Sequence, residues 1–320
     1  MFLKEKCFRR SVSAGYSQFE KGVFVMSAGN RKFEGSMVAI VTPFRKGKVD
    51  KKAFAALIDF HIENGTDALI PCGTTGEAAT LSHDEHRDVL SFVIDYAAGR
   101  IPVICGASSN STEEALGLVK YAKKIKADGV LVVTPYYNKP TQEGLYRHYE
   151  YLAAKAAIPI VLYNVPSRTG VSLAPETVAR LSKIPEIVAI KEASGSLDQV
   201  DRILQLCNIT ILSGEDTLTM PMMALGAKGS ISVTANVIPG RVRDMVHAAL
   251  RSDFEEAREL HQAIYPLSKA MFMETNPIPV KTALWMMGKI ELEFRMPLCE
   301  MSVENQKKLR EVLKQAEVLS

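Results

Sequence analysis

Short runs of apolar residues alternate with longer amphipathic segments along this chain from residue 36 onward. Alternation of this kind is typical of βα units rather than of all-β or all-α folds. Most of the runs are nearly all apolar, as parallel strands buried on both faces are. Eight strands are predicted in this way, at residues 37–41, 68–71, 102–105, 130–133, 159–163, 187–191, 209–213 and 230–233.

The segments between these runs carry residues that begin and end helices. Asp50 precedes a segment whose apolar residues recur at helical spacing until Gly65, which is typical of an N-cap and of a helix end. Ser82 and Glu85, three residues apart, are predicted to form a capping box. Each predicted helix therefore ends just before a predicted strand.

The number of units indicates the fold class. Eight βα units in about 215 residues are typical of a closed (β/α)8 barrel, whereas a doubly wound sheet usually has about five to seven strands. We therefore predict an α/β TIM barrel over residues 35–251. Beyond this point the strand pattern stops, and helical periodicity predicts a C-terminal helical region over residues 252–320, with helices at 254–267, 280–287 and 303–318.

Residues 1–34 differ from the rest, with early basic residues, frequent Ser, Gly and Asn, and no strong periodicity before Phe33. We predict that they form a disordered extension. Two alternatives stay open: translation begins at Met26, or the segment is a targeting peptide. The second is disfavoured by Glu5 and Glu20, because targeting peptides are poor in acidic residues.

Composition narrows the choice of partner and compartment. The net charge of +3 arises from charges spread along the whole chain, which favours a small-molecule partner over nucleic acid or anionic lipid. No apolar run reaches the ~18 residues that a membrane span requires. The five cysteines are scattered without a C-x-x-C pair, which argues against zinc and disulfides and favours the cytoplasm.

Lys191 ends the sixth predicted strand, and barrel enzymes carry their reactive groups at the carboxyl ends of strands. A lysine amine that burial keeps neutral can attack a carbonyl group. The alternative is a structural lysine paired with Glu192 or another carboxylate. The residue alone does not decide between these interpretations.

The run Gly73-Thr74-Thr75-Gly76-Glu77 follows the second predicted strand. It lacks the Lys-Ser/Thr ending of a P-loop and the glycine spacing of a dinucleotide site. Two glycines around two threonines instead allow N–H groups and hydroxyls to converge on a small anion such as a carboxylate. A plain tight turn is the alternative.

Two tyrosines and one arginine lie near other strand ends. Tyr137 and Tyr163 carry phenols that can relay protons when held together, although aromatic residues at such positions more often only pack. Arg168, on the loop after the fifth strand, either binds a substrate carboxylate bidentately or is a solvated loop residue.

A cluster of His83, Glu85 and His86 has the composition of a metal site. Its spacing is H-x-x-H rather than H-E-x-x-H, and no third ligand is evident nearby. We therefore predict no catalytic metal.

Taken together, the strand-end motifs resemble the dihydrodipicolinate synthase and N-acetylneuraminate lyase family. The motifs are G-T-T-G-E (73–77), T-P-Y-Y-N (134–138), Y-N-V-P-S-R-T-G (163–170), I-K-E-A-S-G (190–195) and S-V-T-A-N (232–236). The resemblance covers residues 35 to 318. Thr74, the S-R-T-G run and the N-P-I-P-V-K run at 276–281 resemble the synthase branch.

This resemblance implies a class I aldolase chemistry that needs neither a metal nor an organic cofactor. Lys191 would form an imine with pyruvate, and the derived enamine would add to the aldehyde of L-aspartate 4-semialdehyde. Tyr163 would shuttle protons, linked through Thr74 to Tyr137 from a neighbouring subunit. A homo-oligomer, commonly a dimer of dimers, is therefore implied.

The resemblance also implies binding roles for further residues. Thr75 would bind the pyruvate carboxylate and Arg168 that of the semialdehyde, while Gly214 and Ile231 would line the site through their backbones. Feedback inhibition by L-lysine is a further hypothesis. The residues that match the family's lysine site are His83, His86, Asn110, Glu114 and Tyr136, with Ala78 where some sensitive members carry serine.

Two other functions remain possible from the sequence. A sister aldolase that cleaves N-acetylneuraminate or a keto-deoxy sugar acid would keep Lys191, Tyr163 and the threonines. Arg168 argues against it, because the sugar-acid branches usually lack the S-R-T-G run. A barrel that only binds a metabolite or a partner protein is the second alternative, and no residue supports it specifically.

Overall fold

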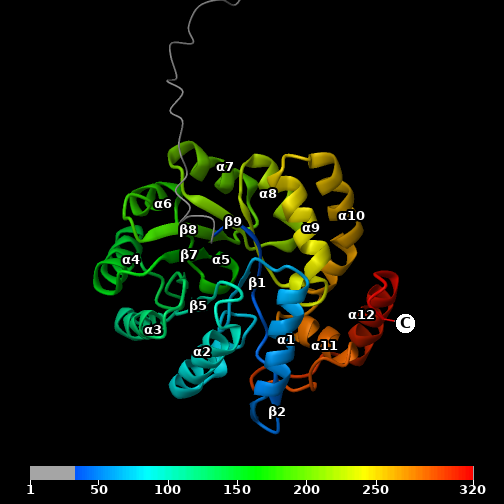
Figure 1. Cartoon of the computed structure of the whole chain (residues 1–320). Coiled ribbons are helices and arrows are strands. Elements are labelled where there is room, and N and C mark those ends of the chain that lie inside the picture. Colours follow the sequence, from blue (N-terminus) through cyan, green and yellow to red (C-terminus); the bar gives the residue numbers. More distant parts are fainter. Residues whose placement is uncertain (1–32, 320) are drawn as a thin grey trace, which may run out of the picture.

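A barrel of parallel strands forms the centre of this protein, whose computed structural model describes residues 33–319 (Figure 1). Its strands are β1 (Gly35–Val38), β4 (Ala68–Leu69), β5 (Ile104–Gly106), β6 (Gly129–Val133), β7 (Ile160–Asn164), β8 (Ile187–Glu192), β9 (Thr210–Ser213) and β10 (Gly229–Ser232). All eight predicted strands are present, with ends that differ by one or a few residues.

The eight-stranded sheet closes on itself. Its hydrogen-bonded order is β4-β1-β10-β9-β8-β7-β6-β5. A parallel bridge between Leu69 and Val103 joins β4 to the chain just before β5, and the Leu69 amide donates to the Pro102 carbonyl at 2.9 Å. The predicted TIM barrel is therefore confirmed.

The alternation of side chains along the strands divides the core into two layers. Met37, Ile70, Val161, Leu212 and Ile231 belong to a cluster inside the barrel. The residues between them face outward and join the larger cluster under the helices. Because both faces of each strand are buried, the strands read as continuous apolar runs.

Helices surround the barrel in Figure 1. Those that connect successive strands are α1 (Lys51–Glu63), α2 (His83–Ala97), α3 (Thr112–Lys124), α4 (Gln142–Ala156), α5 (Pro166–Thr169), α6 (Pro175–Leu181), α7 (Leu197–Leu206) and α8 (Thr219–Leu225), and α9 (Pro239–Leu250) follows β10. The capping predictions are confirmed: the Asp50 side chain accepts from the first turn of α1, and Ser82 and Glu85 form a capping box on α2.

Three further helices form the predicted C-terminal helical region. They are α10 (Phe254–Ala270), α11 (Ile278–Met286) and α12 (Val303–Gln315), which gather on one side of the barrel in Figure 1. The domain boundary at residues 251/252 remains a prediction. The predicted extension of residues 1–34 lies outside the described part of the chain except for Phe33 and Glu34, of which Phe33 is buried in the inner cluster.

The structure departs from the prediction in two short elements. An antiparallel hairpin of β2 (Phe44–Arg45) and β3 (Lys48–Val49) lies between β1 and α1, and positive φ angles at Lys46 and Gly47 make its turn. Arg168, predicted on a loop, lies in the one-turn helix α5. Across the described residues, helices of the length and apolarity needed to cross a membrane are absent.

Candidate active site

Lys191 and Tyr163 lie side by side at the carboxyl ends of β8 and β7. The two residues are register partners on neighbouring strands. Both side chains are buried, with exposed fractions of 5% and 7%, and the Lys191 Nζ atom lies 4.4 Å from the centroid of the Tyr163 ring. The face of an aromatic ring at this distance attracts an ammonium group. The ring is not an anionic acceptor, however, so it does not form an ion pair with the amine.

Glu192 does not pair with Lys191, so the interpretation of Lys191 as a structural lysine bonded to its neighbour is wrong. Strand alternation turns the Glu192 carboxylate away, where it accepts from Asn164 Nδ2 at 3.0 Å and the Ser194 amide at 2.7 Å. Burial raises the pKa of Glu192 despite these donors. Among residues 33–319, the ion pairs do not include Lys191.

Gly214 packs directly against the Lys191 side chain. The Gly214 amide donates to the Glu192 carbonyl at 2.8 Å. A Cβ atom at this position would lie 2.9 Å from Lys191 Cε, closer than van der Waals contact allows. Ile231 is buried inside the barrel in the same cluster as Tyr163. The missing side chain at Gly214 therefore makes room for the lysine.

The threonine run after β4 forms a tight turn. The Gly76 amide donates to the Gly73 carbonyl at 3.1 Å, and the Glu77 amide donates to the Thr74 carbonyl at 3.1 Å. Thr75 is buried, and its Oγ1 accepts from Asn276 Nδ2 at 3.0 Å. The turn thus holds two hydroxyl groups close to the barrel mouth.

A cavity of about 360 Å³ opens at this mouth. Thr74, Tyr163 and Arg168 are among its walls, so the structure brings together three of the residues predicted from separate motifs. Lys191 is not itself among the lining residues, but its Nζ atom lies 4.4 Å from the centroid of the ring of Tyr163, which is. The volume suits a molecule of a few carbon atoms and its bound water.

Glu215 is a charged residue near the site that the sequence analysis did not single out. It follows Gly214 directly and is half-buried. Burial and the neighbouring Asp216 raise the pKa of its carboxyl group, while the positive charges of Lys191 and Arg168 act in the opposite direction. The site therefore has one carboxylate close to both of its cations.

The C-terminal region contributes more of the cavity than the sequence indicated. Thr275, Asn276, Pro277, Pro297 and Leu298 line it. Arg168 Nη2 donates to the Asn276 carbonyl at 3.2 Å, and the Asn276 Oδ1 atom is buried without a partner. The N-P-I-P-V-K run was visible in the sequence, but its position across the barrel mouth was not.

Within one chain, Tyr137 does not line the cavity with the other predicted site residues. Its side chain is 90% exposed, and its backbone has a φ of 71°. The neighbouring Tyr136 lines the cavity instead. A site role for Tyr137 therefore requires a second chain.

Of the five residues predicted for a lysine site, His86 and Tyr136 line the cavity. His86 is buried and lines it, and its Nε2 atom lies 2.8 Å from the Gly106 carbonyl oxygen. Burial lowers the pKa of His86. Ser109 Oγ donates to Glu114 Oε2 at 2.7 Å, and Asn138 Nδ2 donates to the Asn110 carbonyl at 2.9 Å. His83 is exposed.

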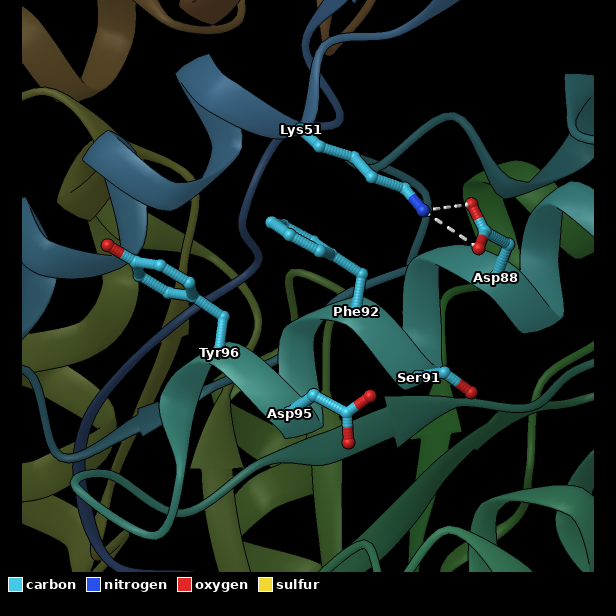
Figure 2. A pocket seen from close by; sticks show the side chains of 6 residues that line it. All are labelled: Lys51, Asp88, Ser91, Phe92, Asp95 and Tyr96. Atoms are coloured by element: carbon cyan, nitrogen blue, oxygen red, sulfur yellow. Dashed lines mark hydrogen bonds and ion pairs between the residues drawn. The ribbon is translucent and has the colours of Figure 1, made fainter.

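A second depression lies between α1 and α2 (Figure 2). Lys51, Asp88, Phe92 and Asp95 are among its lining residues. Lys51 and Asp88 form an exposed ion pair at 2.8 Å across it. Groups of three or more potential metal ligands are absent from the described residues.

Comparisons with known proteins agree with this geometry. The family model described as "Dihydrodipicolinate synthetase family" matches residues 32–316. A 4-hydroxy-tetrahydrodipicolinate synthase from Thermodesulfovibrio yellowstonii is 58% identical over 286 residues, 89% of this chain and 98% of the relative.

Solved structures of dihydrodipicolinate synthases are also similar to this chain. Dihydrodipicolinate synthase from Acinetobacter baumannii, complexed with pyruvate, is 45% identical with a TM-score of 0.88, covering 89% of this chain and 99% of that chain. The enzyme from Cyanidioschyzon merolae, with lysine bound, is 39% identical with a TM-score of 0.88, covering 90% of this chain and 99% of that chain.

Proposed function

The chain belongs to the dihydrodipicolinate synthetase family, and we propose that its Lys191 forms a Schiff base with pyruvate. The enzyme condenses pyruvate with L-aspartate 4-semialdehyde to give 4-hydroxy-tetrahydrodipicolinate for lysine and diaminopimelate biosynthesis. The observation that supports this most is Lys191 itself. It is buried at a strand end, beside Tyr163, and within residues 33–319 no carboxylate forms an ion pair with it.

The reaction proceeds through covalent steps on this amine. Lys191 attacks the C2 carbonyl of pyruvate, and loss of water gives an imine. Loss of a proton from the pyruvate methyl group gives an enamine, whose carbon attacks the aldehyde and forms a C–C bond and a hydroxyl group. The amine of the former semialdehyde then displaces Lys191 from C2, which closes the ring and releases the enzyme.

Tyr163 is positioned to move the protons that these steps require. Its ring lies against the Lys191 amine, and its side chain shares the cavity wall with Thr74. A hydroxyl chain through Thr74 to the partner subunit's Tyr137 would carry protons out of the site. A homo-oligomer, as a dimer of dimers, completes the site because Tyr137 is exposed on its own chain.

The two carboxylates of the substrates bind to different groups. Thr75 receives that of pyruvate, with the backbones of Gly214 and Ile231 enclosing the imine. Arg168, at the cavity wall, receives that of the semialdehyde through its guanidinium fork. The fork suits a planar carboxylate better than the hydroxyl groups of a sugar acid.

L-lysine is the proposed feedback inhibitor. The proposed site consists of His83, His86, Asn110, Glu114 and Tyr136, of which His86 and Tyr136 line the cavity. A lysine-bound relative supports a regulatory site of this kind. The enzyme is proposed to work in the cytoplasm.

A substrate comparison tests this function. Purified protein should condense pyruvate with L-aspartate 4-semialdehyde and leave N-acetylneuraminate uncleaved, and Arg168→Lys should raise the KM for the semialdehyde more than that for pyruvate. Cleavage of a sugar acid without condensation would instead assign the protein to the aldolases that cleave N-acetylneuraminate or a keto-deoxy sugar acid.

A further inference from the structure

A buried ion pair joins the threonine turn to helix α11. Lys281 Nζ donates to Glu77 Oε1 at 2.5 Å, and both side chains are fully buried. Glu77 ends the turn after β4, whereas Lys281 lies 204 residues later in the chain. The pair therefore connects the predicted anion-binding turn with the C-terminal helical region.

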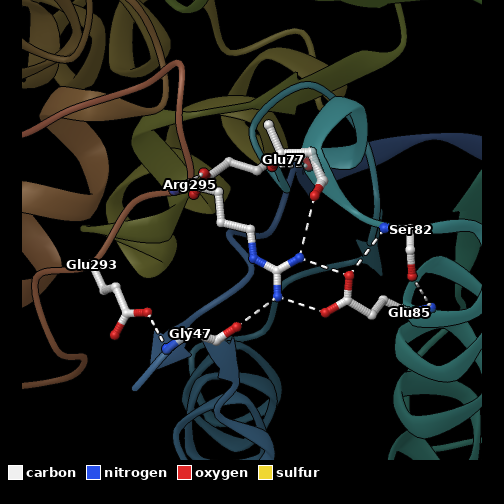
Figure 3. Close-up of polar contacts among 7 residues, drawn as sticks. Gly47, Glu77, Ser82, Glu85, Glu293 and Arg295 are labelled. Atoms are coloured by element: carbon white, nitrogen blue, oxygen red, sulfur yellow. Dashed lines mark hydrogen bonds and ion pairs between the residues drawn. The ribbon is translucent and has the colours of Figure 1, made fainter.

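Both members of the pair make further contacts. Lys281 Nζ also donates to the Glu293 carbonyl at 2.7 Å and lies 4.4 Å from the centroid of the Phe44 ring. The second Glu77 oxygen accepts from the Arg295 amide at 3.3 Å. Figure 3 shows the Arg295 guanidinium beside Glu85, with which it forms two hydrogen bonds, at 2.6 and 2.7 Å.

The turn depends on Glu77 for its shape. Glu77 has a left-handed backbone with φ of 53° and ψ of 36°, which a residue with a side chain adopts only when its surroundings hold it there. Its amide closes the turn on the Thr74 carbonyl, and Thr42 Oγ1 donates to the Gly76 carbonyl at 2.7 Å. The buried carboxylate thus fixes the end of the turn that carries both threonines.

The same C-terminal segment holds two more groups of the cavity. Asn276 Nδ2 donates to Thr75 Oγ1, and the Asn276 carbonyl accepts from Arg168. Asn276 lies five positions before Lys281, at the start of the segment that forms α11. One short segment therefore holds the turn and both proposed carboxylate-binding side chains in place.

We propose that Glu77 and Lys281 are positioning residues for the reaction: their buried ion pair holds the Thr74–Thr75 turn at the distance from Lys191 and Tyr163 that pyruvate binding and proton transfer require. This inference rests on the proposed function. A buried ion pair is a poor source of net stability, because removing two charges from water offsets most of their attraction. In this protein the Glu77–Lys281 pair instead serves to hold the geometry of the turn.

Three variants separate positioning from stability: Glu77→Gln, Lys281→Met and the double substitution. Each single variant leaves a buried charge without its ionic partner and should lower the melting temperature. The double variant buries no unpaired charge and should recover most of that loss. Its kcat/KM for pyruvate should nevertheless stay about ten- to a hundredfold below the wild-type value, with a raised KM for pyruvate, because the turn is no longer fixed.

Leu309→Ala is the matched control, since it leaves a cavity in the buried face of α12 within the same region and does not alter the ion pair. It should lower the melting temperature and leave kcat/KM unchanged. Wild-type kinetics in the double variant would overturn the proposal, as would a double variant that does not fold, because the pair would then serve stability alone. Absence of condensation by the wild-type protein would instead reject the proposed function.

Discussion

Lys191 and Glu192 are consecutive residues with opposite surroundings. Strand alternation places the lysine inside the barrel and the glutamate outside it, among Asn164, Ser194 and Gln199. A lysine at a strand end could be recognised in the sequence because the preceding apolar run marks the strand. The lack of an ion pair between Lys191 and Glu192 could not be recognised in the sequence, because the two residues are neighbours in the chain but face opposite ways in the structure.

Tyr163→Phe tests the proposed role of Tyr163 as a proton shuttle. The substitution keeps the ring against Lys191 and removes only the hydroxyl, so we expect kcat to fall by about 10²- to 10⁴-fold with the melting temperature nearly unchanged. Steady-state kinetics and thermal unfolding measure the two effects.

Tyr121→Phe is the control for that substitution. Tyr121 is a partly buried tyrosine of α3 whose hydroxyl forms a hydrogen bond with Ser91 Oγ at 2.7 Å, outside the barrel. Its loss should cost about 1 kcal/mol of stability and leave kcat unchanged. Equal kcat values for Tyr163→Phe and the wild type would exclude Tyr163 as the shuttle.

Contacts between distant residues mark the limit of the sequence analysis. Thr74, Thr75 and Arg168 could be predicted because each follows a recognisable strand. Asn276 and the Glu77–Lys281 pair could not be given roles, because nothing in a linear pattern relates residues 204 positions apart. The packing of α11 across the barrel mouth creates these contacts.

At the scale of elements, hydrophobic periodicity was sufficient for all eight strands and for the three C-terminal helices. The hairpin of β2 and β3 was missed because each strand has two residues, too few to show a period of two. The α5 helix was missed for a related reason: it is four residues long and contains too few apolar positions to show helical spacing.

Two helices bury histidines whose protonation opposes folding. Burial lowers the pKa of His61 in α1 to about 3 and that of His148 in α4 to about 4. Below about pH 6.5 the unfolded chain binds a proton at each residue while the folded chain does not, so stability present above that pH is lost as the pH falls.

We therefore expect the free energy of unfolding to fall by about 3 kcal/mol from these two residues between pH 6.5 and pH 5. Urea unfolding at a series of pH values measures the slope. His148→Gln should reduce that slope by about one proton, since it removes one of the two groups. An unchanged slope in this variant would show that His148 is protonated in the folded protein.

At the scale of the whole molecule, the exposed Tyr137 predicts an active site shared between chains. Co-assembly of Tyr137→Phe chains with Lys191→Ala chains should restore activity, because in each mixed dimer one site combines an intact lysine with an intact tyrosine. Random mixing in a symmetric dimer gives about a quarter of the wild-type activity. Activity no higher than that of the separate variants would place Tyr137 outside the partner's site.

The proposed mechanism depends most directly on the covalent bond between Lys191 and pyruvate. Borohydride reduction of the protein with pyruvate, followed by peptide mass mapping, should find one carboxyethyl group, on the peptide that contains Lys191. Lys191→Ala should remain unlabelled under the same conditions, while the remaining lysines serve as internal controls. Labelling of another lysine, or condensation activity without any adduct on Lys191, would contradict this mechanism.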